Sequence, residues 1–182
     1  EEHSHGVALL ASQFAGAFGM SEWGKVLGLL HDKGKETNAF QQHIRKESGL
    51  NPDMKVEGDY HHAYIGGILA RRCYGKSFDS FFANPIVSHH TGLHDSDELP
   101  HILQKPIPSE VDVSVKKEKL NKPPFQVQAP DIHHLSRMLF SCLVDADYLD
   151  TEAFMDKESA TLRQGKATLN DLLPRLDRYL SN

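Results

Sequence analysis

Apolar residues recur three or four positions apart in long stretches of this chain, which is the spacing of a helix with one buried face. A shorter helix is predicted to begin at Asn84 and Pro85, an N-cap followed by proline at the first helical position, and to end at Thr91 and Gly92. The pattern therefore predicts an all-α fold. The longer predicted helices cover residues 3–18, 21–33, 59–73, 131–149 and 158–180, with Pro174 interrupting the last.

Residues 93–130 differ in composition from the rest of the chain. Six of the nine prolines lie there, and proline interrupts both helices and central strands. We predict an irregular Pro-rich insertion with a short helix near Leu99 to Leu103 and a strand-like segment over Val111 to Val115. A long loop of this kind is usually either functional or disordered. The lysines near its tip either contact a phosphate backbone or face solvent.

A chain of 182 residues is expected to form one domain, here residues 1–182. Its 20 Lys and Arg and 25 Asp and Glu give a formal net charge of −5, which argues against strong independent binding of nucleic acid through a basic surface. No apolar run approaches the roughly 18 residues of a membrane span, and no signal peptide is recognisable. We therefore expect no membrane partner and a cytoplasmic location.

Two further features bear on the cellular context. Cys73 and Cys142 lie far apart within apolar helical patterns, so we expect buried thiols in a reducing compartment and no disulfide. The chain begins with Glu1 and not with methionine. We therefore expect it to be a fragment of a longer protein.

Histidines and aspartates lie on the buried faces or at the ends of several predicted helices. The apolar helix over residues 21–33 ends in His31 and Asp32, followed by Gly34, which is typical of a helix stop, and by Lys35. A buried carboxylate is costly unless it is compensated, so Asp32 needs a cation or several donors. Lys35 alone would be interpreted as an exposed lysine after a helix end. Other residues in comparable positions are His3, His62, His89, His90, Asp145 and Asp147.

Helical phase selects among neighbouring histidines. His3 lies over the buried stripe of the first predicted helix, whereas His5 falls on the opposite side. His62 shares the buried face of its predicted helix, and His61 points about a quarter turn away. Any one of these histidines, taken alone, is more often a surface residue or a core residue hydrogen-bonded to backbone. Their combination is what favours a metal site.

In order and content these residues resemble the HD superfamily of metal-dependent phosphohydrolases. The closer resemblance is to the HD nuclease domain of the CRISPR-associated type I nuclease-helicase, and it covers nearly the whole chain outside residues 93–130. The double histidine and the trailing lysine make it more specific than a bare His-Asp pair. The motifs that carry it are His3-Ser4-His5-Gly6-Val7-Ala8, Leu30-His31-Asp32-Lys33-Gly34-Lys35, His62-Ala63-Tyr64-Ile65-Gly66, Ser88-His89-His90-Thr91-Gly92 and Ala146-Asp147-Tyr148-Leu149.

The resemblance implies an HD-domain helical bundle and a division of the ligands between two cations. Asp32 would bridge the two ions, and Lys35 would steady the scissile phosphate. Helical phase does not choose between Asp145 and Asp147, which flank the buried face on opposite sides, but the motif favours Asp147. One ion would be held by His3, His31, Asp32 and Asp147, and the other by Asp32, His62, His89 and His90.

Phosphodiester hydrolysis at neutral pH needs an activated water and neutralisation of the charge that develops on the phosphate. Two cations about 3.5–4 Å apart supply both effects, and they require a carboxylate able to bridge them. A ligand set rich in imidazole favours transition metals, so we expect one or two ions of Mn, Fe, Co or Ni, with Mg as a further candidate.

The resemblance implies a nuclease that cuts single-stranded DNA during CRISPR interference, an antiviral defence, together with a helicase domain or subunit and an RNA-guided complex. The alternative is an HD phosphohydrolase that acts on a nucleotide or a cyclic nucleotide through the same ligands. A metal-free, HD-like interaction domain is a third class, and it is disfavoured because every expected ligand position is filled.

Overall fold

The computed structural model describes residues 2–163 and 169–181, and all regular structure within these ranges is helical. The all-α prediction is confirmed. None of the described helices is long and apolar enough to cross a membrane. The α-helices are α1 (Glu2–Gly16), α2 (Ser21–Leu30), α3 (Asn38–Glu47), α4 (Ala63–Tyr74), α5 (Ala83–Ser88), α6 (Glu98–Ile102), α7 (Asp131–Met155), α8 (Lys157–Arg163) and α9 (Leu169–Leu180), and the 3₁₀ helices are η1 (Lys33–Glu36) and η2 (Lys76–Phe78).

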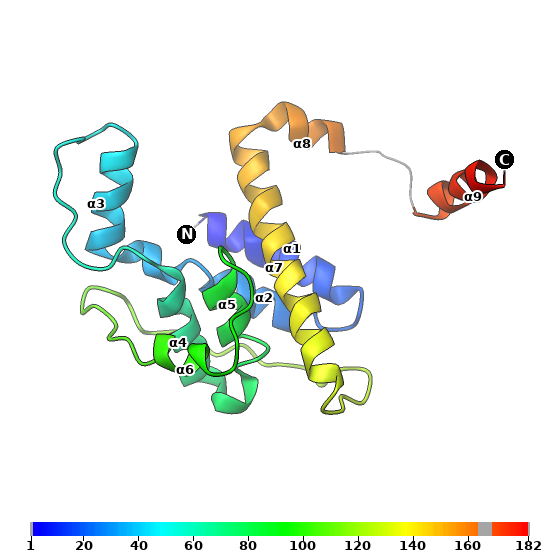
Figure 1. Cartoon of the computed structure of the whole chain (residues 1–182), viewed down its shortest axis with the longest axis horizontal. Helices are drawn as coiled ribbons and strands as arrows, with labels where there is room; N and C mark the ends of the chain where they lie inside the picture. Colours follow the sequence, from blue (N-terminus) through cyan, green and yellow to red (C-terminus); the bar gives the residue numbers. More distant parts are fainter. Residues whose placement is uncertain (1, 164–168, 182) are drawn as a thin grey trace. The chain divides into compact units, whose positions relative to one another are not determined.

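The chain divides into two compact units, residues 1–150 and 151–182, which we describe separately. The first unit contains α1 to α6 and most of α7 (Figure 1). The second contains the end of α7 with α8 and α9, where one long helix over residues 158–180 was predicted; residues 164–168 lie outside the described part. Pro174 lies within α9 and does not end it. The single-domain expectation for residues 1–182 stays a prediction.

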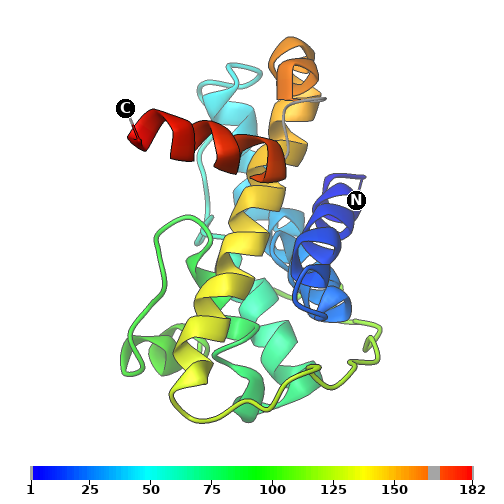
Figure 2. The same ribbon diagram turned by 90° about the vertical axis from the view of Figure 1, so that its right-hand side faces the viewer.

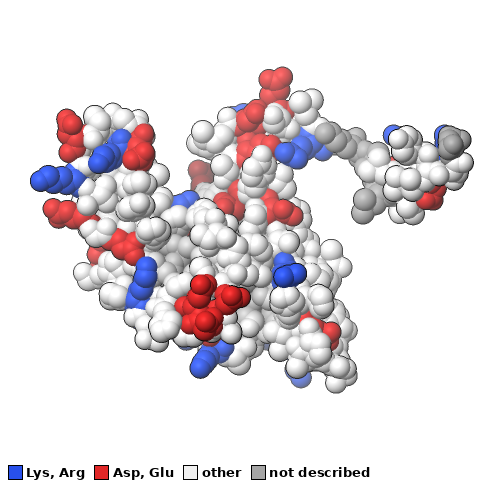
Figure 3. All heavy atoms as spheres, viewed as in Figure 1, with Lys and Arg blue, Asp and Glu red and all other residues white. Residues whose placement is uncertain are grey.

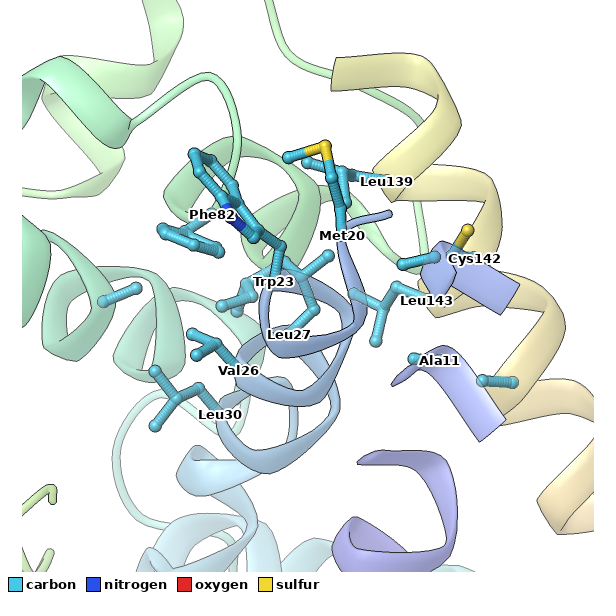
Figure 4. Packing of buried hydrophobic residues seen from close by; sticks show 14 of the residues in the cluster. Ala11, Met20, Trp23, Val26, Leu27, Leu30, Phe82, Leu139, Cys142 and Leu143 are labelled. Atoms are coloured by element: carbon cyan, nitrogen blue, oxygen red, sulfur yellow. The ribbon is translucent and has the colours of Figure 1, made fainter. Parts of the chain in front are cut away.

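The main hydrophobic core of the first unit is built from α1, α2, α4, α5 and α7. Helix α7 crosses α1 in the view of Figure 1, and residues of α1, α2 and α7 pack in the same core (Figures 1 and 2). Leu27 of α2, Phe82 before α5 and Leu143 of α7 are buried together in this core (Figure 4). Full burial of a side chain of this size contributes about 1.5–3 kcal/mol. This core fixes the end of α2, where the candidate site begins.

Helices α1 and α2 pack with almost no space between their backbones. A Cβ atom added at Gly24 would lie 2.1 Å from the Ala11 carbonyl oxygen, and one added at Gly28 would lie 2.4 Å from the Ala8 Cα. Only glycine fits at such distances, because the obstacle is backbone and not a movable side chain. The absence of a side chain therefore allows the close contact that holds α1 beside the end of α2.

Replacing Gly24 with alanine is expected to destabilise the protein by about 1–3 kcal/mol or more, through overpacking. The sign is informative, because the same change in an exposed helix would stabilise it by roughly 1 kcal/mol. Equilibrium urea denaturation measures the difference. Leu9→Ala, on the exposed side of α1, is the control and should change the free energy of unfolding by less than about 0.5 kcal/mol. A Gly24→Ala protein as stable as wild type would contradict this packing.

The 93–130 segment is mostly irregular, as predicted, and contains α6. The strand-like interpretation of Val111 to Val115 is wrong, because these described residues form no strand. Val111 is buried in a second core with residues of α4, α5 and α6, so its hydrophobicity serves packing against helices. The segment is also anchored further along, where the Trp23 Nε1–H donates to the Asn121 carbonyl over 3.0 Å.

Candidate metal centre

The site begins where α2 ends. His31 is fully buried, and its Nδ1–H donates to the Gly28 carbonyl one turn earlier, over 2.8 Å. This hydrogen bond keeps Nδ1 as the donor and directs Nε2 toward the centre, where it would serve as a ligand once a cation takes the place of its proton. The Asp32 side chain is only 4% exposed and lies beside it, with Oδ2 3.3 Å from His31 Nε2. The predicted burial of this pair is therefore found.

Gly34 and Gly66 allow two other segments to pack closely against the end of α2. A Cβ at Gly34 would lie 2.1 Å from the His62 carbonyl oxygen, and one at Gly66 would lie 2.0 Å from the Leu30 carbonyl oxygen. The interpretation of Gly34 as a helix stop is wrong, since it lies inside η1 and its φ is not positive. Its role is to let the His62 segment approach. Gly66 similarly allows α4 to reach the end of α2.

The first group of candidate ligands is His3, His31 and Asp32, whose ligand atoms lie within 4.8 Å of one another. His3 Nε2 is 3.5 Å from Asp32 Oδ2 and 3.0 Å from Asp147 Oδ1. His31 Nε2 is 3.7 Å from the same Asp147 oxygen. Asp147 is thus in position to complete this group. The four residues expected around one ion come together from α1, the end of α2 and α7.

Asp145, the alternative to Asp147, is exposed on the other side of α7. Sequence reasoning missed Asp150, whose Oδ2 lies 2.7 Å from His3 Nδ1. A carboxylate behind a ligand histidine fixes the ring and makes it a better ligand. Gly6 makes room for it, because a Cβ there would clash with the Asp150 carboxylate. The sequence could have predicted this position, because Asp147 and Asp150 are three residues apart and therefore lie on one helix face.

The second group is Asp32, His62, His89 and His90, again with ligand atoms within 4.8 Å of one another. His62 Nε2 lies 3.2 Å from Asp32 Oδ1 and 3.0 Å from His90 Nε2. His89 Nε2 is 3.8 Å from Asp32 Oδ1, and its Nδ1–H donates to the Ile86 carbonyl over 2.6 Å. His89 is therefore held with Nε2 facing the centre, as His31 is.

Helical phase predicted that His62 and not His61 faces inward, and the structure places His62 so, but the reason was wrong. The helix was predicted to begin at residue 59, but α4 begins at Ala63, and both histidines precede it. The His61 side chain is 73% exposed and bonds to Asp59 at 2.6 Å. His62 faces Asp32 because its backbone rests on Gly34.

The buried polar atoms of this centre are not satisfied by the protein. His31 Nε2, His89 Nε2 and both Asp32 carboxylate oxygens have no hydrogen-bond partner. Lys35 Nζ is 2.5 Å from Asp32 Oδ2, but neither this contact nor that of His62 has hydrogen-bond geometry. A buried donor or acceptor without a hydrogen bond costs about 1–3 kcal/mol, although the charge of Asp32 is partly balanced by Lys35. Nitrogen lone pairs and carboxylate oxygens directed at common points are what a divalent cation requires, so the residues fit a metal.

Charge and burial also set the protonation of these groups. Burial acts to lower the pKa of His31, but the carboxylates of Asp147 and Asp32 overcome this and raise it to about 9. Burial would raise the pKa of Asp32, yet His31, His62 and Lys35 hold it far below its ordinary value. Burial, with the neighbouring imidazoles of His31 and His90, lowers the pKa of His89 to about 3. His89 is therefore neutral and able to bind a metal.

Removing His62 is expected to remove one ion and leave the other. After reconstitution with Mn²⁺ and gel filtration, elemental analysis should give two equivalents for wild type and one for His62→Ala. His61→Ala is the matched control, because His61 lies next in sequence but faces away from Asp32, and it should keep two. Equal metal content in all three proteins would contradict the assignment of His62 as a ligand.

Helical scaffolds that collect histidines and carboxylates from several helices are characteristic of metal-dependent enzymes. The comparison with known families makes the class specific. Residues 1–128 match the HD domain model, so the chain belongs to the HD family, which supports a metal-dependent hydrolase. The match stops before α7, so Asp147 and Asp150 lie beyond it. No curated protein matches the sequence significantly.

Proposed function

We propose that this chain is a metal-dependent nuclease that hydrolyses phosphodiester bonds of single-stranded DNA in CRISPR interference. The proposal rests on the HD family assignment and on motifs that resemble the nuclease domain of the type I nuclease-helicase. The observation that carries it is the position of Asp32, which belongs to both candidate ligand groups. A carboxylate shared in this way is what a two-ion phosphodiesterase requires.

The residues of the centre have separable tasks. Asp32 offers one oxygen to each group, with Oδ2 toward His3 and His31 and Oδ1 toward His62 and His89. Cations bound there would lower the pKa of water and offset the charge on the phosphate. Lys35 lies beside Asp32 with a side chain that is 37% exposed. Once Asp32 is neutralised by cations, the ammonium group is free to bind a phosphoryl oxygen.

The centre is open on two sides, which suits a chain substrate. His3, Asp32 and Lys35 line one hollow of about 500 Å³. His62 and His90 line another of about 440 Å³. A strand could therefore pass over the centre with nucleotides on both sides of the cleaved bond. The second candidate is an HD phosphohydrolase for a nucleotide or cyclic nucleotide, favoured by the fact that either hollow can hold one nucleoside.

Delivery of DNA by partners fits the surface charge. The chain carries a net charge of −5, and on the face drawn in Figure 3 the Lys and Arg side chains of the described residues are scattered among acidic ones. Weak intrinsic attraction for a polyanion is expected from such a surface. We propose that a helicase domain or subunit, within an RNA-guided complex, supplies the unwound strand.

The substrate class is tested by offering circular single-stranded DNA, circular duplex DNA, deoxynucleotides and cyclic nucleotides, each with Mn²⁺ or with EDTA. We expect cleavage of the single-stranded circle with Mn²⁺ and a return to background with EDTA, because the cations provide the activated water. Circular substrates show internal cleavage, which an exonuclease contaminant cannot produce. Hydrolysis of nucleotides alone would overturn the nuclease proposal in favour of the second candidate.

A further inference from the structure

A pocket of about 440 Å³ adjoins the metal centre. Its walls come from α3, the start of α4 with the segment before it, the end of α5 with the residues that follow, and the end of α6. Phe40, Tyr60, Tyr64 and Ile102 contribute aromatic or apolar surface to it. Sites for small organic ligands have this size and this kind of lining, with a few polar groups for orientation. Neither the metal ligands nor Lys35 account for these aromatic rings.

The rings in this pocket wall are arranged face to face. The Tyr60 ring stacks on His43, with centroids 4.1 Å apart and planes 13° apart, and on His61, with centroids 4.9 Å apart and planes 15° apart. Tyr60 is nevertheless 39% exposed. Tyr60 is the ring common to both stacked pairs, so it holds the two imidazoles in place, and the ring surface left for a further planar group is that of His43 and His61, which also line the pocket. Stacking on aromatic side chains is how many proteins hold the bases of single strands.

The pocket is continuous with the second ligand group. His62 and His90 line the pocket and belong to that group. Phe40 packs edge-on against His62, with centroids 4.9 Å apart, and Lys35 Nζ lies 5.9 Å from the Phe40 ring. A phosphate held beside Lys35 would therefore have one of its nucleosides at the entrance to the pocket.

The charge of the pocket suits a neutral group and not a phosphate. Among the described residues that line it, Lys105 is the one lysine or arginine. Its ammonium is paired with Asp59 at 2.9 Å and lies 4.9 Å from the Tyr64 ring centroid. Asp59 also accepts from the His61 backbone N–H over 2.9 Å. The Lys105 charge is thus already compensated, and Asp59 holds the backbone of the Tyr60–His61 segment in place.

We infer that this pocket binds a nucleobase adjacent to the cleaved phosphodiester and that Tyr60 is a substrate-positioning residue. The inference rests on the proposed function, because it assumes a nucleotide substrate at the metal centre. Lys35 and the candidate ligand groups would receive the phosphate, and the stacked rings would receive the base. Because every base has a planar face, the pocket would add affinity with little sequence preference.

The test uses short single-stranded oligonucleotides with one natural phosphodiester between methylphosphonate links. One version carries all bases, and two others lack the base on the 5′ or the 3′ side of the cleavable bond. With Mn²⁺ and wild-type protein, loss of the base that occupies the pocket should raise KM by roughly 5- to 150-fold, the range for one stacked base. Loss of the base on the other side should have a smaller effect.

Tyr60→Ala should raise KM for the intact substrate by a similar factor, with kcat changed less, and should have no further effect on the substrate that lacks the stacked base. Tyr60→Phe keeps the ring and should behave as wild type. Tyr60→Leu, which keeps apolar bulk without a ring face, is a second variant if Tyr60→Ala folds poorly. Phe125→Ala is the control, since Phe125 has similar exposure, 44%, and does not line the pocket.

The outcomes separate the two proposals. If wild type cleaves the intact substrate but Tyr60→Ala has an unchanged KM, or raises KM equally with and without the flanking bases, the pocket inference is overturned and the proposed function stands. If wild type with Mn²⁺ cleaves no oligonucleotide, the proposed function fails and the pocket inference fails with it.

Discussion

Replacing Asp32 with asparagine is expected to reduce phosphodiester hydrolysis by about 1,000-fold or more. Cations supply several kcal/mol of transition-state stabilisation, and each 1.36 kcal/mol is a factor of ten in rate. Asparagine has nearly the same shape, but it offers one neutral oxygen and cannot serve both groups. Single-turnover cleavage with saturating Mn²⁺ measures the loss. Mn²⁺ should also raise the Tm of wild type and not that of Asp32→Asn, because only the native state of wild type binds it.

Asp145→Asn is the matched control, since Asp145 has the same chemistry but lies exposed on α7. It should keep wild-type activity, whereas Asp147→Asn should lose activity, because the Asp147 carboxylate lies beside His3 and His31. This pair of variants also decides between the two aspartates that helical phase left open. Full activity of Asp32→Asn would contradict the assignment of Asp32, and a large loss in Asp145→Asn would contradict the choice of Asp147.

Replacing Lys35 with alanine is expected to separate catalysis from metal binding. The rate should fall about 100- to 1,000-fold, which is the usual cost of losing one group that stabilises developing charge. The metal content should stay at the wild-type value, because Lys35 is positively charged and is not a ligand. Cleavage kinetics and elemental analysis on the same preparation give both quantities.

Lys33→Ala provides the comparison for Lys35. The Lys33 ammonium is already paired with Glu36 over 2.8 Å, so its removal should change the rate little. If Lys35→Ala keeps the wild-type rate, Lys35 only closes the helix end. If the Lys35→Ala protein loses its metal as well, Lys35 maintains the structure around Asp32 and does not act in the reaction.

The all-α class and the central pair of the candidate site, His31 and Asp32, could be predicted from the sequence. The apolar run of α2 ends abruptly in His31 and Asp32, and a buried carboxylate in that position needs a cation or several hydrogen-bond donors. Long helices with regular apolar stripes, such as α1 and α7, were predicted within a few residues at their starts, although α7 continues to Met155, beyond the predicted residue 149. Hydrophobic periodicity is most informative where a helix has one solvent-exposed face and one buried face.

Other features depend on contacts between distant segments, which periodicity does not encode. Gly34 was interpreted through its own backbone conformation, whereas its role depends on the approach of His62. The partnership of Asp150 with His3 depends on how α1 lies along α7. The Val111 to Val115 stretch has the alternation of a strand, but the described residues near it offer helices and no partner strand, so Val111 packs into a helical core.

The most direct test of the central claim is anomalous diffraction from crystals grown with Mn²⁺. Two peaks about 3.5–4 Å apart are expected on either side of the Asp32 carboxylate, one among His3, His31 and Asp147 and the other among His62, His89 and His90. The absence of any peak within coordination distance of Asp32 would contradict the assignment of this cluster as a metal centre.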